Sequence, residues 1–269
     1  MIILAATPIG NLGDASRRLV DALEAAEIVV AEDTRVAIQL MRGLQVKNQP
    51  KLVALHEHNE EALVASLVEA ARTSDLLVVT DAGMPTISDP GYRLVVAATK
   101  AEVPVTVLPG PSAVLTALAL SGLPTDRFVF DGFVPRKSRR KFFAGLAREE
   151  RTMVFLESPN RLAETLSDLS AELGEDRKVA VARELTKLHE EVRRGTASEL
   201  ADWARGGVRG EICLVVEGAK PVKVDFDSAA RQVRALVASG KALKEAAAEV
   251  SEVTGHSKRE LYESGLQRQ

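Results

Sequence analysis

Three loops rich in glycine and proline are the places where this chain could hold a small ligand. They read ATPIGNLGDAS (6–16), TDAGMPTISDPGYR (80–93) and LPGPSAV (108–114). Glycine lets the backbone approach a ligand closely, and proline fixes a loop so that less entropy is lost on binding. Any one such loop is more often an ordinary turn. Three of them at alternate strand ends of one predicted sheet favour a binding site.

The composition of these loops limits the class of ligand. Gly10 and Gly13 do not complete the GxGxxG fingerprint of dinucleotide-binding proteins, NLGDAS supplies no basic residue for a pyrophosphate, and the chain has no Walker lysine. We therefore expect a ligand other than a nucleotide polyphosphate. Its polar groups should suit backbone amides, backbone carbonyls and the carboxylate of Asp81.

The elements that must position these loops are short apolar runs that alternate with amphipathic segments, a pattern typical of parallel β-α-β units. The strands predicted in the first half are 2–6, 27–31, 52–55, 75–80 and 103–108. The helices predicted between them are about 15–26, 34–43, 59–73, 90–102 and 111–121. Together they predict a five-stranded α/β layer whose ligands lie at the carboxyl ends of the strands.

A second α/β domain of similar size is predicted after a break at Gly122-Leu123-Pro124. Its strand-like runs are 127–134, 152–157, 178–184 and 211–218, and a helix is predicted at 160–173. The tail then changes to helices at 228–239 and 241–253, followed by a Thr-Gly-His turn and a third helix. We therefore expect three parts, namely an N-terminal α/β domain over 1–122, a C-terminal α/β domain over 123–222 and a helical extension over 223–269.

The bulk composition indicates an ordinary globular protein. The chain has 269 residues, 46% of them hydrophobic and 27% charged, with a net charge of -3. The overall charge therefore gives no indication of nucleic-acid binding. Its single cysteine, Cys213, excludes an internal disulfide and a multi-cysteine zinc site. The apolar start is too short for a signal sequence, and no run approaches the length of a membrane span. We expect a soluble, cytoplasmic protein that does not associate with a membrane.

Several motifs, in a fixed order, resemble those of the tetrapyrrole methylase family. They are TPIGNLGD, AEDTR, HEHNE, TDAGMPTISDPGYR, PGPSA, FLESPNRL and ARELTK, spread over residues 7–187. The sequence is most similar to the branch of that family that methylates a cytidine 2′-hydroxyl in 16S ribosomal RNA of the small subunit. Thr7-Pro8-Ile9-Gly10-Asn11 replaces the Gly-Pro-Gly-Asp loop of the tetrapyrrole-modifying enzymes, which favours the RNA branch, and Met84 stands where that branch more usually has threonine.

The resemblance implies the class III methyltransferase fold, with S-adenosyl-L-methionine bound in a cleft between two α/β domains, usually in a homodimer. A sulfonium donor is positively charged, so carbonyls and a carboxylate suit it better than basic side chains do. The residues expected to bind the cofactor are Thr7, Pro8, Gly10, Asn11, Asp81, Ala82, Gly83, Pro85, Pro109, Gly110, Ser112 and Ala113.

A ribose hydroxyl is a poor nucleophile, so a positioned base or hydrogen-bond acceptor should assist the transfer. HEHNE offers His56, Glu57 and His58, and ARELTK offers Glu184 and Lys187. We expect no metal at the two histidines, because ligands at i and i+2 on an exposed strand end are more typical of a polar loop. The acids of AEDTR could bind a ribose, but they are more typical of a helix N-terminus.

RNA binding requires a basic surface, and PRKSRRK (135–141) is the best candidate for one. Its candidate RNA-binding residues are Arg136, Lys137, Arg139, Arg140 and Lys141. Such a run is about as often a solvated face of no function. The C-terminal helices resemble a small helix-turn-helix, which could bind RNA or brace a dimer.

Three hypotheses remain open at this point. The first is methylation of small-subunit ribosomal RNA, the second is methylation of a tetrapyrrole, and the third is a non-catalytic factor that binds the ribosome. Aromatic residues are 4% of the chain and none lies within residues 1–91. The sequence therefore predicts a site that binds ribose and backbone and has no aromatic-rich pocket for a flipped base.

Overall fold

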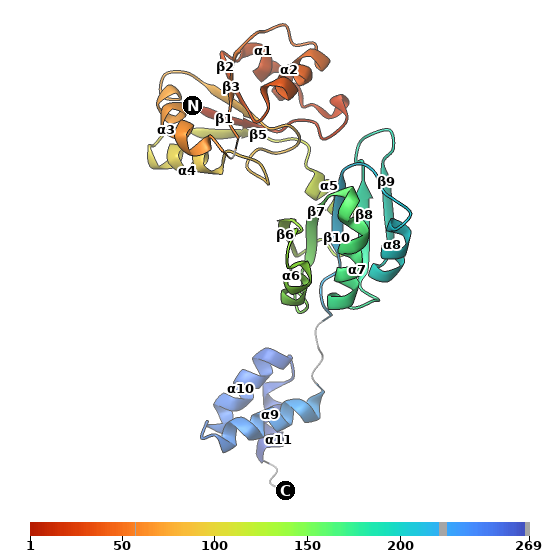
Figure 1. The fold of residues 1–269 in the computed structure, drawn as a ribbon. Helices are drawn as coiled ribbons and strands as arrows, with labels where there is room; N and C mark the ends of the chain where they lie inside the picture. The colour runs from red at the N-terminus through yellow and green to blue at the C-terminus, as the bar shows by residue number, and fades with distance from the viewer. Residues whose placement is uncertain (57, 221–224, 267–269) are drawn as a thin grey trace. The chain divides into compact units, whose positions relative to one another are not determined.

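The computed structural model describes residues 1–56, 58–220 and 225–266. The chain divides into two compact units, Met1–Ala219 and Lys220–Gln269. The first unit contains two five-stranded sheets, and the second contains three helices (Figure 1). Among the described residues, no helix combines the length and the apolar character that crossing a bilayer requires.

The first sheet is wholly parallel and runs in the order β3-β2-β4-β1-β5. Its strands are β1 (Ile2–Ala5), β2 (Ile28–Ala31), β3 (Lys51–Ala54), β4 (Leu76–Val79) and β5 (Val105–Leu108). All five predicted strands are confirmed to within three residues. Strands such as Leu76-Leu77-Val78-Val79 are buried along their whole length, which explains why they read as continuous apolar runs.

Helices cover both faces of this sheet. α1 (Arg17–Ala25) and α2 (Thr34–Gly43) pack on one face, and α3 (Glu60–Ala70) and α4 (Tyr92–Lys100) pack on the other. The chain therefore leaves β1 toward one face and leaves its neighbour β4 toward the opposite face. The adjacent carboxyl ends of β1 and β4 form the switch point at which open α/β sheets bind ligands.

Helix α5 (Ala113–Ser121) was expected in the first layer, but its side chains pack against the second sheet. Val114, Ala117 and Leu118 contact a cluster that includes Val154 and Val215. The segment AVLTALALS is apolar nearly all round, so its sequence gives no preference for one sheet over the other. The helix thus follows the first sheet in sequence and serves the second in packing.

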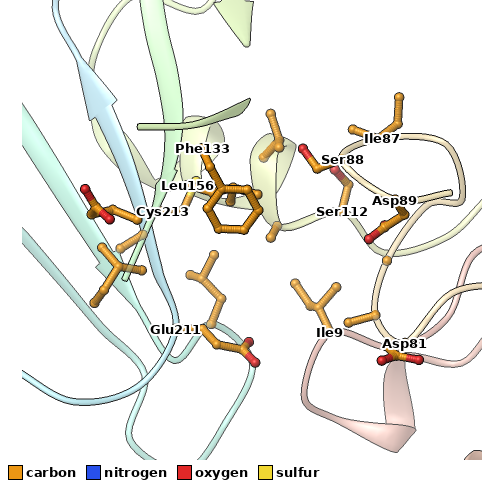
Figure 2. Close-up of a pocket in the computed structure, with 18 of the residues that line it drawn as sticks. Ile9, Asp81, Ile87, Ser88, Asp89, Ser112, Phe133, Leu156, Glu211 and Cys213 are labelled. Carbon is orange, nitrogen blue, oxygen red and sulfur yellow. The ribbon is translucent and has the colours of Figure 1, made fainter. Parts of the chain in front are cut away.

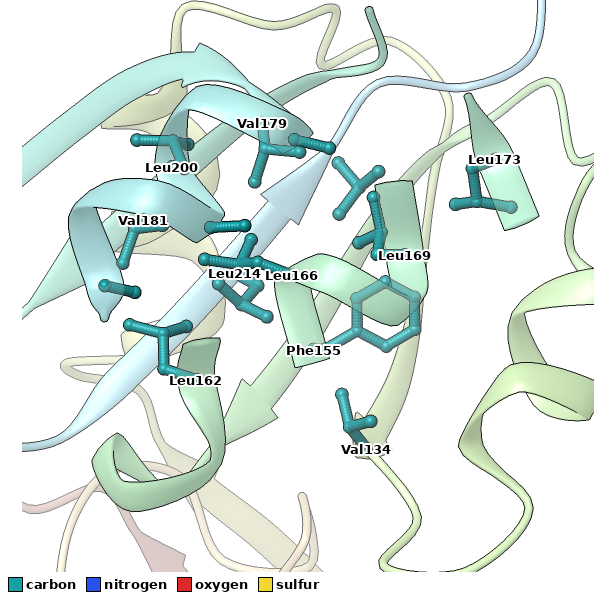
Figure 3. Close-up of a cluster of buried hydrophobic side chains, with 14 of the residues drawn as sticks. Val134, Phe155, Leu162, Leu166, Leu169, Leu173, Val179, Val181, Leu200 and Leu214 are labelled. Atoms are coloured by element: carbon teal, nitrogen blue, oxygen red, sulfur yellow. The ribbon is translucent and has the colours of Figure 1, made fainter. Parts of the chain in front are cut away.

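The second sheet is mixed, in the order β6-β7-β10-β8-β9. Its strands are β6 (Phe128–Phe133), β7 (Thr152–Glu157), β8 (Lys178–Arg183), β9 (Glu191–Thr196) and β10 (Ile212–Val216). Only β6 and β7 pair in parallel, and the other pairs are antiparallel. On the face away from α5 lie α6 (Arg139–Gly145), α7 (Leu162–Leu173), which continues the short 3-10 helix η2 (Pro159–Arg161), and α8 (Ala197–Ala204). Figure 3 shows the side chains of this core, including Phe155, Leu166 and Leu214.

The C-terminal unit is a small helical body with its own core. α9 (Phe226–Ala238), α10 (Leu243–Thr254) and α11 (Lys258–Leu266) bury Val233, Val250 and Leu261 together. Gly255 ends α10 in the left-handed conformation, with φ of 71°. A left-handed glycine at this position is a common way to stop a helix and turn the chain. The predicted helix, turn and helix over this region are confirmed.

Candidate functional site

A pocket of about 470 Å³ lies between the two sheets of the Met1–Ala219 unit. The first sheet and its loops supply Ile9, Glu32, Asp81, Ala82, Gly83, Met84, Ile87, Ser88 and Asp89. The rest of the lining is Ser112, Ala113, Val114, Phe130, Phe133, Leu156, Glu157, Ser158, Pro159, Ala182, Leu185, Gly210, Glu211, Ile212 and Cys213. In Figure 2, Asp81, Asp89 and Ser88 face Phe133, Leu156 and Glu211 across the pocket. Its volume is in the range of ordinary small-molecule sites.

The loop after β1 and the loop after β4 are joined by backbone hydrogen bonds. Thr7 N donates to the Gly83 carbonyl at 2.9 Å, and Gly83 N donates to the Thr7 carbonyl at 3.1 Å. The buried Thr7 hydroxyl also donates to the Thr80 carbonyl at 3.2 Å. Thr7 therefore fixes the position of the pocket loop without lining the pocket itself.

The loop from residue 80 to residue 91 has an unusual backbone. Gly83, Thr86, Ser88 and Gly91 all have positive φ, of 85°, 74°, 66° and 117°. The two non-glycine residues are in a conformation that is unfavourable for L-amino acids and persists only where the surroundings enforce it. Such strain is common at ligand sites, and here it lies in the segment that lines the pocket.

Glu60 anchors the far end of this loop. Its carboxylate Oε1 accepts hydrogen bonds from Gly91 N at 3.0 Å and from Arg93 N at 3.1 Å. The residue is only 7% exposed, so these two amides satisfy a buried charge at the N-terminus of α4. HEHNE was predicted to supply a base, whereas its last residue serves to position the pocket loop.

The pocket lining is acidic. Its carboxylates are Glu32, Asp81, Asp89, Glu157 and Glu211, and none of the described residues that line it is a lysine, arginine or histidine. Burial raises the pKa of Asp81. Burial, together with the charges of Glu32 and Asp81, raises the pKa of Asp89 to about 7. A cationic ligand would relieve this repulsion, whereas an anionic ligand would increase it.

The predicted cofactor residues divide into two groups in the structure. Asp81, Ala82, Gly83, Ser112 and Ala113 line the pocket. Outside the lining are Thr7, Pro8, Gly10, Asn11, Pro85, Pro109 and Gly110. The missing side chain of Gly110 faces β1, where a Cβ would lie 3.0 Å from the Ala6 Cβ, and a Cβ on Gly10 would lie 2.5 Å from the Lys187 Cγ. These two glycines allow close packing of the loops around the pocket.

No candidate base among the described residues lines the pocket, although Glu184 and Lys187 lie beside its Glu211. His56 and His58 are exposed on the loop after edge strand β3, with ring centroids 6.0 Å apart, and Glu57 is outside the described residues. Lys187 Nζ pairs with Glu184 at 2.9 Å and with Glu211 at 3.2 Å. Burial alone would lower the pKa of Lys187, but these two carboxylates together raise it. A lysine held protonated in this way is a poor proton acceptor.

The basic segment at 135–141 is not uniform. Arg139 is enclosed, with 13% of its side chain exposed, and pairs with Asp168 at 2.6 Å and Glu164 at 3.3 Å on α7. Arg140 pairs with Glu172 at 2.7 Å. Arg136, Lys137 and Lys141 are exposed, and no acid in the described part of the chain pairs with them. The three exposed residues are therefore better placed for phosphate contacts.

The pocket lining includes two aromatic residues, which the composition of residues 1–91 does not suggest. Residues 1–91 contain none, but β6 in the second sheet brings Phe130 and Phe133 into the lining. The prediction considered only the glycine-rich half of the chain, and the pocket is shared between both halves. Phe133 and Glu211 were missed for the same reason. Asp89 was missed although it lies in the loop TDAGMPTISDPGYR, from which only Asp81, Ala82, Gly83 and Pro85 were selected. Glu32, which also lines the pocket, lies in the motif AEDTR. The acids of this motif were predicted to lie at a helix N-terminus, and the neighbouring Asp33 does cap α2.

Among the described residues, no group of three or more histidine, cysteine, aspartate or glutamate side chains is arranged to hold a metal ion. Cys213 is buried in β10, and burial raises the pKa of its thiol to about 12. A thiol in this state is a weak nucleophile.

Comparison with known proteins assigns both parts of the chain. Residues 1–201 match the family described as Tetrapyrrole (Corrin/Porphyrin) Methylases, and residues 224–269 match the RsmI C-terminal HTH domain. A protein of Mycobacterium bovis named Ribosomal RNA small subunit methyltransferase I is 50% identical, over 99% of this chain and 94% of its own length. A protein of the same name in Escherichia coli O157:H7 is 40% identical, over 100% and 95%.

A solved structure shares the fold of the first unit. It is the uroporphyrin-III C-methyl transferase of Thermus thermophilus complexed with S-adenyl homocysteine. The TM-score is 0.55 and the sequence identity is 21%. The match covers 80% of this chain and 96% of the Thermus thermophilus chain.

Proposed function

This chain belongs to the tetrapyrrole methylase family, and on that premise we propose that it methylates a cytidine 2′-hydroxyl in 16S ribosomal RNA of the small subunit. The methyl donor is S-adenosyl-L-methionine, which supplies a methyl group already activated by a positively charged sulfur. The observation that carries the proposal for this site is the acidic pocket at the carboxyl ends of β1 and β4. The relatives that match nearly the whole chain are named for small-subunit ribosomal RNA.

The pocket residues fit a cationic donor. Glu32, Asp81 and Asp89 place negative charge on the first-sheet side, where burial makes that charge unfavourable until a cation compensates it. Glu157 is already satisfied, because it accepts hydrogen bonds from Arg161 and Thr165. Gly83 and Ala113 leave room for a ligand to approach the backbone.

The chemistry demands alignment more than acid or base strength. The ribose oxygen forms a bond to the methyl carbon while the carbon–sulfur bond breaks with its electrons left on sulfur, and the hydroxyl proton passes to an acceptor or to water. Positioning of this kind contributes a large part of rate enhancement. Asp89 lies in the pocket with a pKa near 7, which makes it a better candidate for the acceptor than the histidines of HEHNE.

Two further features of the proposal concern the assembly and the setting. We expect a homodimer, as in the family it belongs to, and we expect the chain to meet its substrate in the cytoplasm. The helical unit at the C-terminus matches a domain found in the named branch, and we expect it to contribute to binding the ribosomal particle.

Mass-spectrometric mapping of small-subunit RNA tests the function. RNA from a strain that lacks this chain should miss one ribose methyl group on a cytidine, and the purified protein with S-adenosylmethionine should restore it. RNA with a 2′-deoxy nucleotide at the target should accept no methyl group. Transfer to that deoxy RNA would place the methyl on the base, and transfer to a tetrapyrrole in place of RNA would assign the second function considered above. An unchanged methylation pattern in the deletion strain would contradict the proposal.

A further inference from the structure

A second hollow adjoins the acidic pocket. Its volume is about 630 Å³, and its lining is Phe133, Val134, Pro135, Arg136, Ser158, Asn160 and Arg161. Phe133 and Ser158 line both spaces, so the hollow and the pocket are neighbours. Apart from Arg136, a candidate for phosphate contacts, the residues that line only this hollow have no role in the proposed function.

Phe133 stands between the two spaces and is unusually exposed. Its exposed fraction is 60%, which is high for a phenylalanine, a residue type that is usually buried. The chain has seven phenylalanines. In Figure 2 its ring projects into the pocket from the end of β6. An exposed aromatic ring beside a binding pocket is typical of a surface that stacks a planar ligand.

The backbone of β6 gives Phe133 this orientation. Phe130 pairs with Val154 and Phe133 with Leu156, so three steps on β6 correspond to two on β7. Gly132 has a φ of 70° at this irregularity. A bulge of this kind turns the following side chain away from the regular alternation of the strand. Only glycine adopts such a φ readily, so the sequence Asp131-Gly132-Phe133 is suited to presenting the ring.

Polar groups with unused hydrogen-bonding capacity line the same hollow as the ring. Within the ranges that the structure describes, the Asn160 amide makes no hydrogen bond and Arg136 makes no ion pair. Arg161 donates from Nη2 to the Val134 carbonyl at 3.0 Å and pairs with Glu157, whereas its buried Nη1 has no partner in that same part of the chain. An amide can read the edge of a base, and guanidinium groups suit phosphate or a base carbonyl.

We propose that this hollow binds the nucleotide next to the methylated cytidine, in single-stranded RNA. Its base stacks on Phe133, the Asn160 amide hydrogen-bonds the edge of the base, and Arg136 contacts its phosphate. This inference rests on the proposed function, since it takes RNA as the substrate. The arrangement of aromatic ring, amide and guanidinium is the one by which proteins recognise unpaired nucleotides. It also provides the base contact that the first half of the chain lacks.

The test compares variants on small ribosomal subunits from a strain that lacks the methyl group. Phe133→Ala should lower kcat/KM by about 5- to 150-fold, which corresponds to the loss of one base–aromatic stack. Phe133→Tyr keeps a six-membered ring that can stack and should recover most of this loss. Asn160→Ala should lower kcat/KM by about two- to tenfold through a higher KM. Phe128→Leu is the matched control, because it lies on the same strand outside both spaces and should change nothing.

Calorimetry with S-adenosylmethionine separates the hollow from the cofactor pocket. Asn160→Ala and Arg136→Ala should bind the cofactor like the wild type, because neither residue lines that pocket. Equal kcat/KM for wild type, Phe133→Ala and Asn160→Ala would overturn the proposal.

Failure of the proposed function would look different, because the wild type itself would then transfer no methyl group. Filter binding of the unmethylated subunits to the same variants would in that case still decide the proposal. Loss of affinity in Phe133→Ala but not in Phe128→Leu would support it, and equal affinity would overturn it.

Discussion

Protonation of Asp89 should control how tightly the cofactor binds. Its pKa of about 7 means that roughly 3% of the protein carries an ionised Asp89 at pH 5.5, against roughly 90% at pH 8. If only the ionised form attracts the cation, the apparent affinity follows that fraction. The dissociation constant of S-adenosylmethionine should therefore fall between pH 5.5 and pH 8, by at most about 30-fold.

The Asp89→Asn variant isolates this effect. It keeps the size of the side chain and removes the titration, so its dissociation constant should vary much less with pH and should resemble that of the wild type near pH 5.5. Calorimetry at both pH values in two buffers of different ionisation enthalpy gives the affinity and the number of protons released. A wild-type dissociation constant that is equal at pH 5.5 and pH 8, with no proton release, would refute the reasoning.

The same substitution should stabilise the fold, with a sign that follows from the raised pKa. The neutral carboxyl is favoured in the folded state, so the stability associated with it is complete below the ordinary value of 3.8 and is lost as the pH rises to about 7. Full enclosure would make this loss roughly 4 kcal/mol, but Asp89 is partly exposed, and solvent screening reduces it to about 1–2 kcal/mol. Asp89→Asn should gain that amount at pH 8 and nothing near pH 4 in urea unfolding. A variant that loses stability at pH 8 would contradict this account.

Three further results are expected. Lys137→Glu with Lys141→Glu should reduce the slope of log RNA affinity against log salt by about one for each phosphate that is no longer bound, and an unchanged slope would make these lysines an ordinary solvated surface. Arg139→Glu should instead lower the thermal unfolding temperature, because it breaks the enclosed pair with Asp168; an unchanged temperature would argue against that pair. Glu60→Ala should weaken cofactor binding severalfold, while Glu60→Gln, which can still accept from Gly91 N, should recover most of it. A cofactor affinity in Glu60→Ala equal to that of the wild type would mean that the loop from residue 80 to residue 91 keeps its conformation without Glu60.

Much of the fold could be predicted from the sequence, because buried parallel strands are continuous apolar runs. β9 could not, since Glu191-Val192-Arg193-Arg194-Gly195-Thr196 is a largely polar strand at the edge of its sheet. Most of its side chains are polar, so no apolar alternation marks it. α8 was missed along with it, although Thr196 and Glu199 form a capping box at its start.

The candidate site was predictable only on its glycine-rich side. Asp81 and Gly83 belong to a recognisable loop, and their place in the pocket follows from the end of β4. Phe133 and Glu211 carry no local signal, because their role depends on how the second sheet packs against α5 and the first loops. HEHNE misled for a related reason: the position of Glu60 beneath Gly91 is a contact between residues 31 positions apart.

The division of the pocket between two separately cored sheets has a consequence for how the first unit unfolds. Each sheet has its own apolar clusters, so each can in principle lose its structure in a separate transition. A ligand that needs residues from both, such as Asp81 and Glu211, binds only when both are intact, and its binding free energy then opposes the loss of either one. At a hundred times its dissociation constant a ligand adds about 2.7 kcal/mol to the folded state. Cofactor binding should therefore couple the unfolding of the two sheets more tightly than their packing alone does.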